Sequence, residues 1–182
     1  MNDFLYKHIE VENLDDITKE LTDWHDKNVG DKTQFKIIST KEILRSLPKL
    51  NQWFISNNLK PTDTVYLNIN PLTNQAIHLD RQDKRSNNLA LNFPIKNCGH
   101  TFTRFYKDTG KYTTWINPET NASYLFLDEE NPELLGEYYL TKPTLLNILV
   151  PHQVFNPTLH PRVCLSFRFK DDPWHLVNKD IN

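Results

Sequence analysis

The C-terminal two thirds of the chain restrict its fold most, because short β-type runs follow one another there without helical periodicity. From about residue 62, β-branched and aromatic residues gather in segments separated by Pro, Asn, Asp and Gly. We predict strands over residues 64–69, 75–80, 89–95, 101–107, 112–116, 123–127, 136–141, 144–150 and 162–169. About nine strands with no helix between them favour an antiparallel sandwich or barrel-like core.

Helical signals are confined to the N-terminal third. Apolar residues recur at spacings of three and four over residues 14–24, which predicts an amphipathic helix. Ser39 and Glu42 have the spacing of a capping box and predict a second helix, which Pro48 interrupts. Helices followed by strands indicate an α+β chain. With 182 residues and 38% apolar content we expect one domain over 1–182, with a helical layer over about 1–60 and a β-core over about 62–170.

The composition excludes several classes of protein. A net charge of -2 gives no basic excess, so nucleic acid is not indicated as a partner. No apolar run is long enough to span a bilayer, and the N-terminus MNDFLYKHIEVEN lacks the basic-then-apolar order of a signal peptide. We therefore expect a soluble, cytoplasmic protein with no membrane partner. Cys98 and Cys164 are expected to be free buried thiols.

The segment QAIHLD places two polar groups in an otherwise apolar strand. Residues two apart on a strand point to the same face, so His78 and Asp80 project together while Ile77 and Leu79 face the other way. An imidazole and a carboxylate are two of the ligands that a divalent metal prefers. Taken alone, the two residues fit a hydrogen-bonded surface pair better than a metal site.

A second group of polar residues lies near the C-terminus, in VPHQVFNPTLHPRVCLS. His152 closes a predicted strand, a Pro/Asn-rich turn follows, and Arg162 opens the next strand. Two histidines and one carboxylate on neighbouring strands form the facial triad of non-haem Fe(II) oxygenases. An arginine beside such a triad can hold a carboxylate in a bidentate fork.

The order His78-x-Asp80, His152, Arg162 resembles the pattern of Fe(II)- and 2-oxoglutarate-dependent oxygenases. The segments LALNFPIKNC, NILVPHQVFN and RVCLSFRF are similar in style to short bacterial or phage members related to the aspartyl/asparaginyl β-hydroxylases. The resemblance covers about residues 64 to 169. It implies a double-stranded β-helix (a jelly roll, cupin-like) with flanking helices, and a dioxygenase that hydroxylates a small-molecule or peptide substrate.

The resemblance also assigns roles to residues. His78, Asp80 and His152 would bind Fe(II), and Arg162 would hold the distal carboxylate of the cosubstrate 2-oxoglutarate. Cys164 stands where the family often has a hydroxyl, and Ser166 lies two residues further along the same face. Other polar residues on or beside the intervening strands could hydrogen-bond the cosubstrate, namely Asn92, Asn97, Thr101, Thr103 and Tyr106. A one-residue shift in strand register would turn the opposite set inward.

Two other interpretations fit a jelly roll. One is a non-catalytic binding or structural module, for instance a phage-encoded one, in which His78, Asp80 and His152 do not converge. The other is a cupin, which a chain with four glycines and no His-x-His disfavours. The strand aromatics are expected to pack in the core or at its rim instead of forming a binding cage; they are Trp115, Tyr124, Phe126, Tyr138 and Tyr139.

Overall fold

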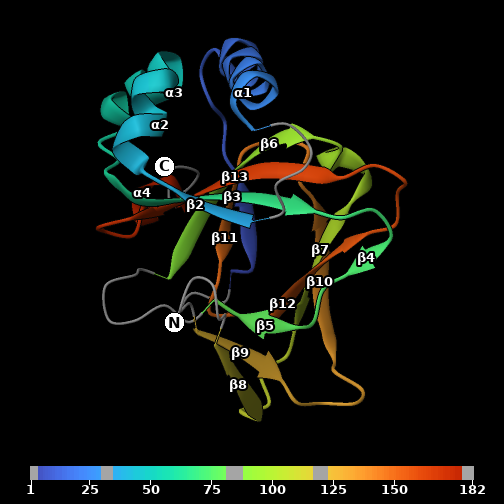
Figure 1. Cartoon of the computed structure of the whole chain (residues 1–182). Coiled ribbons are helices and arrows are strands. Elements are labelled where there is room, and N and C mark those ends of the chain that lie inside the picture. Colours follow the sequence, from blue (N-terminus) through green and yellow to red (C-terminus); the bar gives the residue numbers. More distant parts are fainter. Residues whose placement is uncertain (1–3, 30–34, 81–87, 117–122, 178–182) are drawn as a thin grey trace.

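A computed structural model of the chain describes residues 4–29, 35–80, 88–116 and 123–177. Two antiparallel β-sheets form its body, and helices α1 (Leu14–Asn28), α2 (Thr40–Ser46) and α3 (Pro48–Ser56) lie on one side of it (Figure 1). None of the helices in these ranges has the length and apolar character needed to cross a membrane. The helical layer and the sheet body together match the expected α+β organisation.

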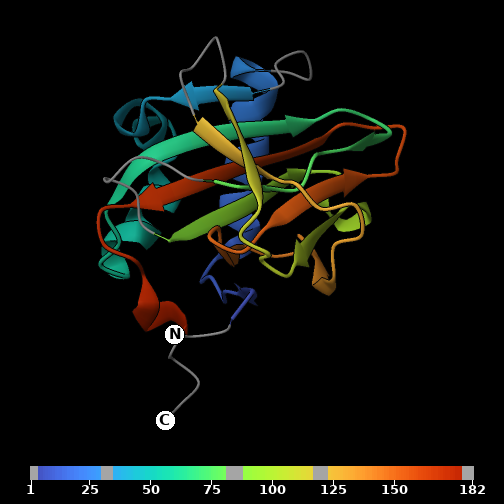
Figure 2. The same cartoon turned by 90° about the horizontal axis from the view of Figure 1, so that it is seen from below.

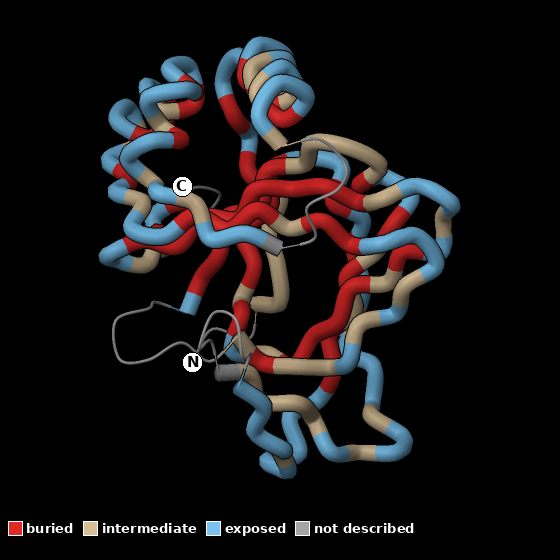
Figure 3. The backbone as a smooth tube through the Cα atoms, in the orientation of Figure 1, coloured by how far each residue is buried: buried red, intermediate tan, exposed pale blue. Residues whose placement is uncertain are grey.

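The first sheet, called the major sheet below, lies under the helices (Figure 1). Its strands, in spatial order, are β1 (Tyr6–His8), β11 (Thr144–Asn147), β6 (Leu89–Lys96), β13 (Arg162–Phe169), β3 (Pro61–Ile69) and β2 (Phe35–Ile38). All eight residues of β13 are buried. Figure 3 shows the same result as continuous red along the centre of this sheet.

The second sheet, called the minor sheet, faces the inner side of the major sheet (Figures 1 and 2). Its strands are β10 (Leu134–Tyr139), β7 (Phe102–Tyr106), β12 (His152–Asn156), β5 (His78–Leu79), β9 (Ser123–Leu127) and β8 (Tyr112–Ile116), while β4 (Thr73–Asn74) also pairs with β12. The 3-10 turn η1 (Cys98–His100) follows β6, and the short helix α4 (Trp174–Val177) follows β13. Because the chain alternates between two facing antiparallel sheets, the body is a jelly roll.

The helices bury their apolar faces against the outer side of the major sheet. Phe54 of α3 packs edge-to-face on Phe167 and Phe93, at ring-centroid distances of 5.0 and 6.1 Å. The predicted start of α2 is confirmed, because the Ser39 hydroxyl accepts a hydrogen bond from the Glu42 amide. Pro48 begins α3 as its first residue, where its missing N–H leaves no helical hydrogen bond unmade.

Strand β13 separates two different environments by simple alternation. Its odd-numbered residues Val163, Leu165, Phe167 and Phe169 belong to the core beneath the helices. Its even-numbered residues point the other way, between the two sheets: Arg162, Cys164, Ser166 and Arg168. Three of the four are polar. The interior between the two sheets, called the chamber below, therefore combines these side chains with an apolar cluster that includes Ala90, Phe105 and Cys164.

Several predicted strand boundaries need correction. The predicted strand 144–150 ends at Asn147, and His152 opens a separate strand, β12, instead of closing the preceding one. The predicted strand 75–80 is reduced to His78–Leu79. The N-terminal region also supplies β1 and β2 to the major sheet and so is not only a helical layer. These strands pair with distant partners, which local sequence patterns do not reveal.

Candidate metal centre

Three predicted ligands meet at one end of the interior. His152 lies directly opposite His78 in the pairing of β12 with β5, and Asp80 follows β5 on the same side as His78. One ligand atom from each residue lies within 4.8 Å of the others. The imidazole rings of His78 and His152 are 4.7 Å apart, centroid to centroid. The jelly roll therefore brings residues from distant parts of the chain to one point.

Both histidines are held in the tautomer that a metal needs. The Nδ1 atom of His78 lies 2.8 Å from the Ala76 carbonyl oxygen, and Nδ1 of His152 lies 2.9 Å from the Val150 carbonyl oxygen. A carbonyl oxygen only accepts, so each Nδ1 carries the proton and donates it. In the neutral form of each ring, Nε2 then carries the lone pair that a metal binds. Fixing the outer ring nitrogen in this way is typical of metal-binding histidines.

Asp80 is fixed by Arg168, a residue that the sequence analysis did not single out. The Arg168 guanidinium donates from Nη2 to Oδ2 of Asp80 and from Nη1 to the Ser166 hydroxyl, both at 2.6 Å. The other carboxylate oxygen, Oδ1, lies 3.4 Å from Nε2 of His78. Asp80 thus keeps Oδ1 directed into the triad while Oδ2 is occupied. The signal available in the sequence was the alternation of β13, which puts Arg162, Ser166 and Arg168 on one face.

Burial and mutual charge shift the pKa values of all three ligands. Burial, reinforced by the neighbouring His78, lowers the pKa of His152 to about 4, so its imidazole is neutral at physiological pH. Burial would also lower the pKa of His78, but the hydrogen bond and charge of Asp80 outweigh it and raise the pKa. For Asp80, burial opposes ionisation, yet His78 and Arg168 hold its pKa well below its usual range. The carboxylate is therefore ionised and available as a ligand.

Arg162 is buried inside the same chamber without an acidic partner among the residues that the structure describes. Its side chain is only 1% exposed. Nη1 lies 3.6 Å from the Cys164 sulfur, and Nε has no hydrogen-bond partner within the described ranges. Its other neighbours include Cys98 and Tyr138, which are uncharged because burial raises both pKa values to about 12. A buried guanidinium in such surroundings is suited to bind an anion.

The remaining predicted cosubstrate residues divide into two groups. Ser166 and Asn92 face each other across β13 and β6, and Thr103 lies opposite Tyr138 on the minor sheet; all four are buried in the chamber wall. The Asn92 side-chain oxygen has no hydrogen-bond partner in the described part of the chain. Tyr138 was not predicted to take part. Its hydroxyl adds a polar group beside Arg162.

Asn97 and Tyr106 point away from the chamber, contrary to the predicted positions, and the buried hydroxyl of Thr101 is already hydrogen-bonded within the chain. Asn97 donates from Nδ2 to the Thr158 hydroxyl and the His160 carbonyl, so it braces the β12–β13 loop. The Tyr106 hydroxyl accepts from Gln153, which points to the opposite face of β12 from His152. The Thr101 hydroxyl donates to the Cys98 carbonyl and closes the η1 turn. The alternation on β7 and β12 decides the placement of Tyr106.

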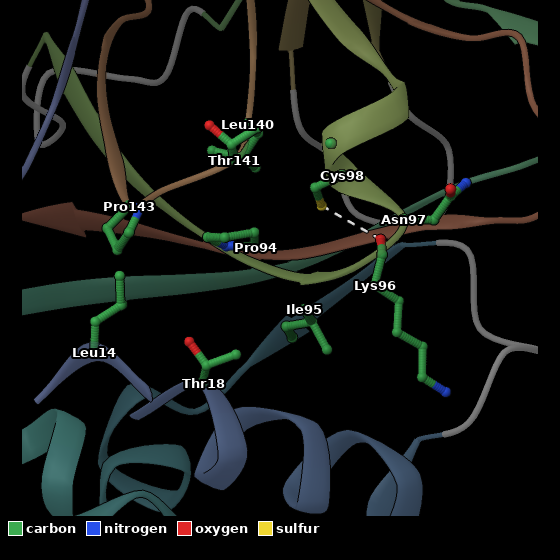
Figure 4. A pocket seen from close by; sticks show the side chains of 11 residues that line it. Leu14, Thr18, Pro94, Ile95, Lys96, Asn97, Cys98, Leu140, Thr141 and Pro143 are labelled. Atoms are coloured by element: carbon green, nitrogen blue, oxygen red, sulfur yellow. Dashed lines mark hydrogen bonds between the residues drawn. The ribbon is translucent and has the colours of Figure 1, made fainter. Parts of the chain in front are cut away.

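A pocket of about 280 Å³ lies outside this chamber, between α1, η1 and the segment that joins β10 to β11 (Figure 4). Its lining is largely apolar and contains none of the triad residues: Leu14, Thr18, Pro94, Ile95, Lys96, Asn97, Cys98, Gly99, Leu140, Thr141 and Pro143. The Cys98 thiol donates to the Lys96 and Val163 carbonyl oxygens, at 3.4 and 3.0 Å. The thiol is therefore engaged in the structure and is not a reactive group of the pocket.

Comparison with solved structures identifies the fold. The non-heme alpha ketoglutarate dependent carbocyclase SnoK from nogalamycin biosynthesis matches with a TM-score of 0.51 at 10% identity, over 91% of this chain and 80% of that one. The chain has a double-stranded β-helix fold. This confirms the predicted fold class. No protein-family model and no curated protein sequence matches the chain.

Two further similar structures are hydroxylases. A prolyl hydroxylase from Trichoplax adhaerens, solved with a hypoxia inducible factor peptide fragment, matches at a TM-score of 0.49 and 11% identity over 93% of this chain and 85% of that chain. A prolyl-4-hydroxylase from Pseudomonas putida matches at 0.48 and 12% identity, over 93% and 94%. The likeness to the aspartyl/asparaginyl β-hydroxylases in particular stays a prediction.

Proposed function

We propose that this chain is an Fe(II)- and 2-oxoglutarate-dependent dioxygenase that hydroxylates an organic substrate. The observation that carries the proposal is a two-histidine, one-carboxylate cluster in the same chamber as the buried guanidinium of Arg162, which has no acidic partner among the described residues. Metal-binding clusters and buried arginines each occur separately in proteins of many functions. Together they provide the two binding functions that a metal and a dicarboxylate cosubstrate require.

The donor set fits Fe(II). His152 presents a neutral nitrogen, His78 presents Nε2 once that atom carries no proton, and Asp80 presents an ionised oxygen, which together are the ligand combination of non-haem Fe(II) oxygenases. Bound Fe(II) would supply the oxidation of a substrate C–H bond, with dioxygen and 2-oxoglutarate as co-reactants. The protein's own part is to keep both histidines in one tautomer and, through Arg168, to keep one oxygen of Asp80 free for the metal.

The chamber fits 2-oxoglutarate. A dicarboxylate with one end at the triad can place its other end against Arg162, where a bidentate pair would satisfy the guanidinium. The buried polar groups of Ser166, Asn92 and Thr103 lie on strands that enclose the same space. Cys164 contributes a neutral thiol at the position where a hydroxyl was expected, so the cosubstrate would be held mainly by charge at Arg162.

The non-catalytic module is the less favoured alternative. That hypothesis predicts that His78, Asp80 and His152 lie too far apart to share a metal, whereas their ligand atoms lie within 4.8 Å of one another. The convergence supports the enzyme. A small molecule or peptide remains the expected substrate.

An anaerobic titration tests the proposal. Adding Fe(II) and then 2-oxoglutarate to the metal-free protein should produce the visible metal-to-ligand charge-transfer band, with one equivalent of each bound. Arg162→Leu should lose the band at cosubstrate concentrations that saturate the wild type, and His152→Ala should lose it at all concentrations. Arg104→Ala is the matched control, because Arg104 is an arginine of the outer face of the minor sheet, paired with Glu137.

The proposal fails if the wild type gives no band, or if Arg162→Leu titrates like the wild type. Conversion of 2-oxoglutarate to succinate under air, measured with and without Fe(II), then establishes turnover. A bound complex that forms the band but consumes no 2-oxoglutarate would identify a non-catalytic member of the fold.

A further inference from the structure

A ribbon of two strands continues the metal-bearing edge of the minor sheet. β9 pairs with β5 so that Phe126 lies opposite His78, and β8 pairs with β9 so that Trp115 lies opposite Tyr124. Figure 1 shows this ribbon beyond β5, at the end of the molecule away from the helices. Directly opposed residues of antiparallel strands share a face. Trp115, Tyr124 and Phe126 therefore lie on the same face as the metal ligand His78.

The rings on this face form one continuous surface that reaches the triad. Trp115 lies 5.9 Å from Tyr124 and 6.0 Å from Phe126, between ring centroids. The His78 ring contacts Tyr124 and Phe126 edge-to-face, at centroid distances of 6.0 and 6.3 Å. Trp115 is 44% exposed and the other two rings are half-buried. An exposed aromatic surface with one edge on a metal ligand differs from ordinary core packing.

The charges near this surface are already compensated. The Asp80–Arg168 ion pair beside His78 joins opposite charges at 2.6 Å, so a charged group docking on the rings would gain little from either member. The described residues of this face of the ribbon are themselves uncharged: Thr113, Trp115, Tyr124 and Phe126. Rings of this kind stack on other planar aromatic rings.

We propose that Trp115, Tyr124 and Phe126 form the substrate-docking surface of the iron site, and that the substrate presents to it a neutral planar aromatic ring. The proposal rests on the proposed function only in naming the bound molecule as substrate. The ring lies flat on the ribbon, and a carbon attached to it reaches the open side of the triad past His78. Aromatic residues expected to be simple rim packing thereby determine which substrates are oxidised.

Three probes with one carbon skeleton test the ring requirement. 2-Naphthylmethanol is neutral and planar, decahydro-2-naphthylmethanol is neutral and puckered, and 2-naphthylmethylamine is planar and cationic. The protein is labelled with 5-fluorotryptophan and studied by fluorine NMR without iron or 2-oxoglutarate. It has four tryptophans, and the resonance missing from Trp115→Phe identifies the one on the ribbon.

Naphthylmethanol should shift the Trp115 resonance saturably and leave the other three in place. The decahydro compound should bind about tenfold or more weakly, because it lacks the stacking face. The amine should bind no more tightly than the alcohol, because Asp80, the carboxylate of the nearby triad, is already paired with Arg168. Phe126→Leu should weaken naphthylmethanol binding, measured at the Trp115 resonance. Ile116→Ala is the matched control, since Ile116 is 58% exposed on the opposite face of the same strand.

Each result supports or overturns the proposal. Equal shifts by the planar and puckered alcohols, or an affinity that Phe126→Leu leaves unchanged, overturn the ring surface. In the Fe(II)/2-oxoglutarate complex, naphthylmethanol should also shift the wavelength of the charge-transfer band. Docking that leaves this wavelength unchanged overturns the assignment as the substrate site. Because the NMR measurement needs neither iron nor cosubstrate, normal docking with no band overturns the oxygenase function and leaves the ring surface standing.

Discussion

Replacing Arg168 with methionine tests the ion pair that positions Asp80. Methionine keeps an unbranched stem of similar length in the chamber but removes both hydrogen bonds, to Asp80 and to Ser166. The pair is largely removed from water, with side-chain exposures of 5% for Arg168 and 19% for Asp80. Removing one partner of a buried pair costs about 3–5 kcal/mol, and the partial exposure of Asp80 places the expected loss near the lower limit, about 3 kcal/mol.

Urea denaturation of the metal-free protein in chelator gives this free energy of unfolding. Asp80→Asn should destabilise by a similar amount, because it leaves the guanidinium of Arg168 buried without its counter-charge. The double variant should lose less than the sum of the single losses, by about 1–3 kcal/mol of coupling energy. If Arg168→Met unfolds within about 0.5 kcal/mol of the wild type, or if the two losses simply add, Arg168 does not hold Asp80 in the way described.

Three further outcomes test other parts of the structure by the same denaturation assay. Burial raises the pKa of Tyr138 to about 12 in the folded chain, against about 10 unfolded, so the stability that the neutral phenol contributes is complete below pH 10 and is lost as the pH rises towards 12. Tyr138→Phe should therefore lose about 2–3 kcal/mol less stability than the wild type on going to alkaline pH, and equal losses in the two proteins would contradict this. Glu20 accepts hydrogen bonds from the Lys49 and Leu50 amides at the start of α3, so Glu20→Ala should destabilise the protein by about 1–2 kcal/mol. The exposed control Asp23→Ala should change stability by less than about 0.5 kcal/mol, and similar effects of the two variants would refute the cap. Phe93→Ala should remove about 3–5 kcal/mol, and a loss below about 1 kcal/mol would show that the core under the helices is not packed as described.

The sequence was sufficient where side-chain alternation acts within one segment. His78 and Asp80 share a face because they are two residues apart, and Arg162, Cys164 and Ser166 share a face of β13 for the same reason. Each of these placements needs only the local strand geometry. The amphipathic helix over residues 14–24 likewise follows from its own spacing.

The sequence does not predict the position of a side chain where pairing between distant strands determines it. Tyr106 sits on a correctly predicted strand, yet the register of β7 with β12 turns it to the outer face with Gln153. His152 was placed at the end of a strand instead of at the start of β12, because β12 is defined by its partners β7, β5 and β4 and not by its composition. Arg168 was overlooked for the same reason, since its partner Asp80 is 88 residues away.

The two buried arginines of β13 differ in a way that assigns them different tasks. Arg168 has a permanent counter-charge in Asp80, whereas Arg162 has no acidic partner in the described part of the chain. Removing a buried charge that has no partner relieves a desolvation penalty, while removing one member of a pair creates such a penalty. Arg162→Leu should therefore leave the ligand-free protein as stable as the wild type or more stable, the opposite sign to Arg168→Met.

When 2-oxoglutarate is bound, Arg162 should stabilise the protein instead of destabilising it. If its guanidinium is kept for an incoming carboxylate, 2-oxoglutarate with a divalent metal should raise the unfolding free energy of the wild type by RT ln(1 + [L]/Kd), about 2.7 kcal/mol at a hundredfold excess over Kd. Arg162→Leu should gain little from the same addition, and thermal melts with and without 2-oxoglutarate measure both gains. A large loss of stability in ligand-free Arg162→Leu would mean that Arg162 already has a strong partner within the protein, and the chamber would then lack the free positive charge that recognises the cosubstrate.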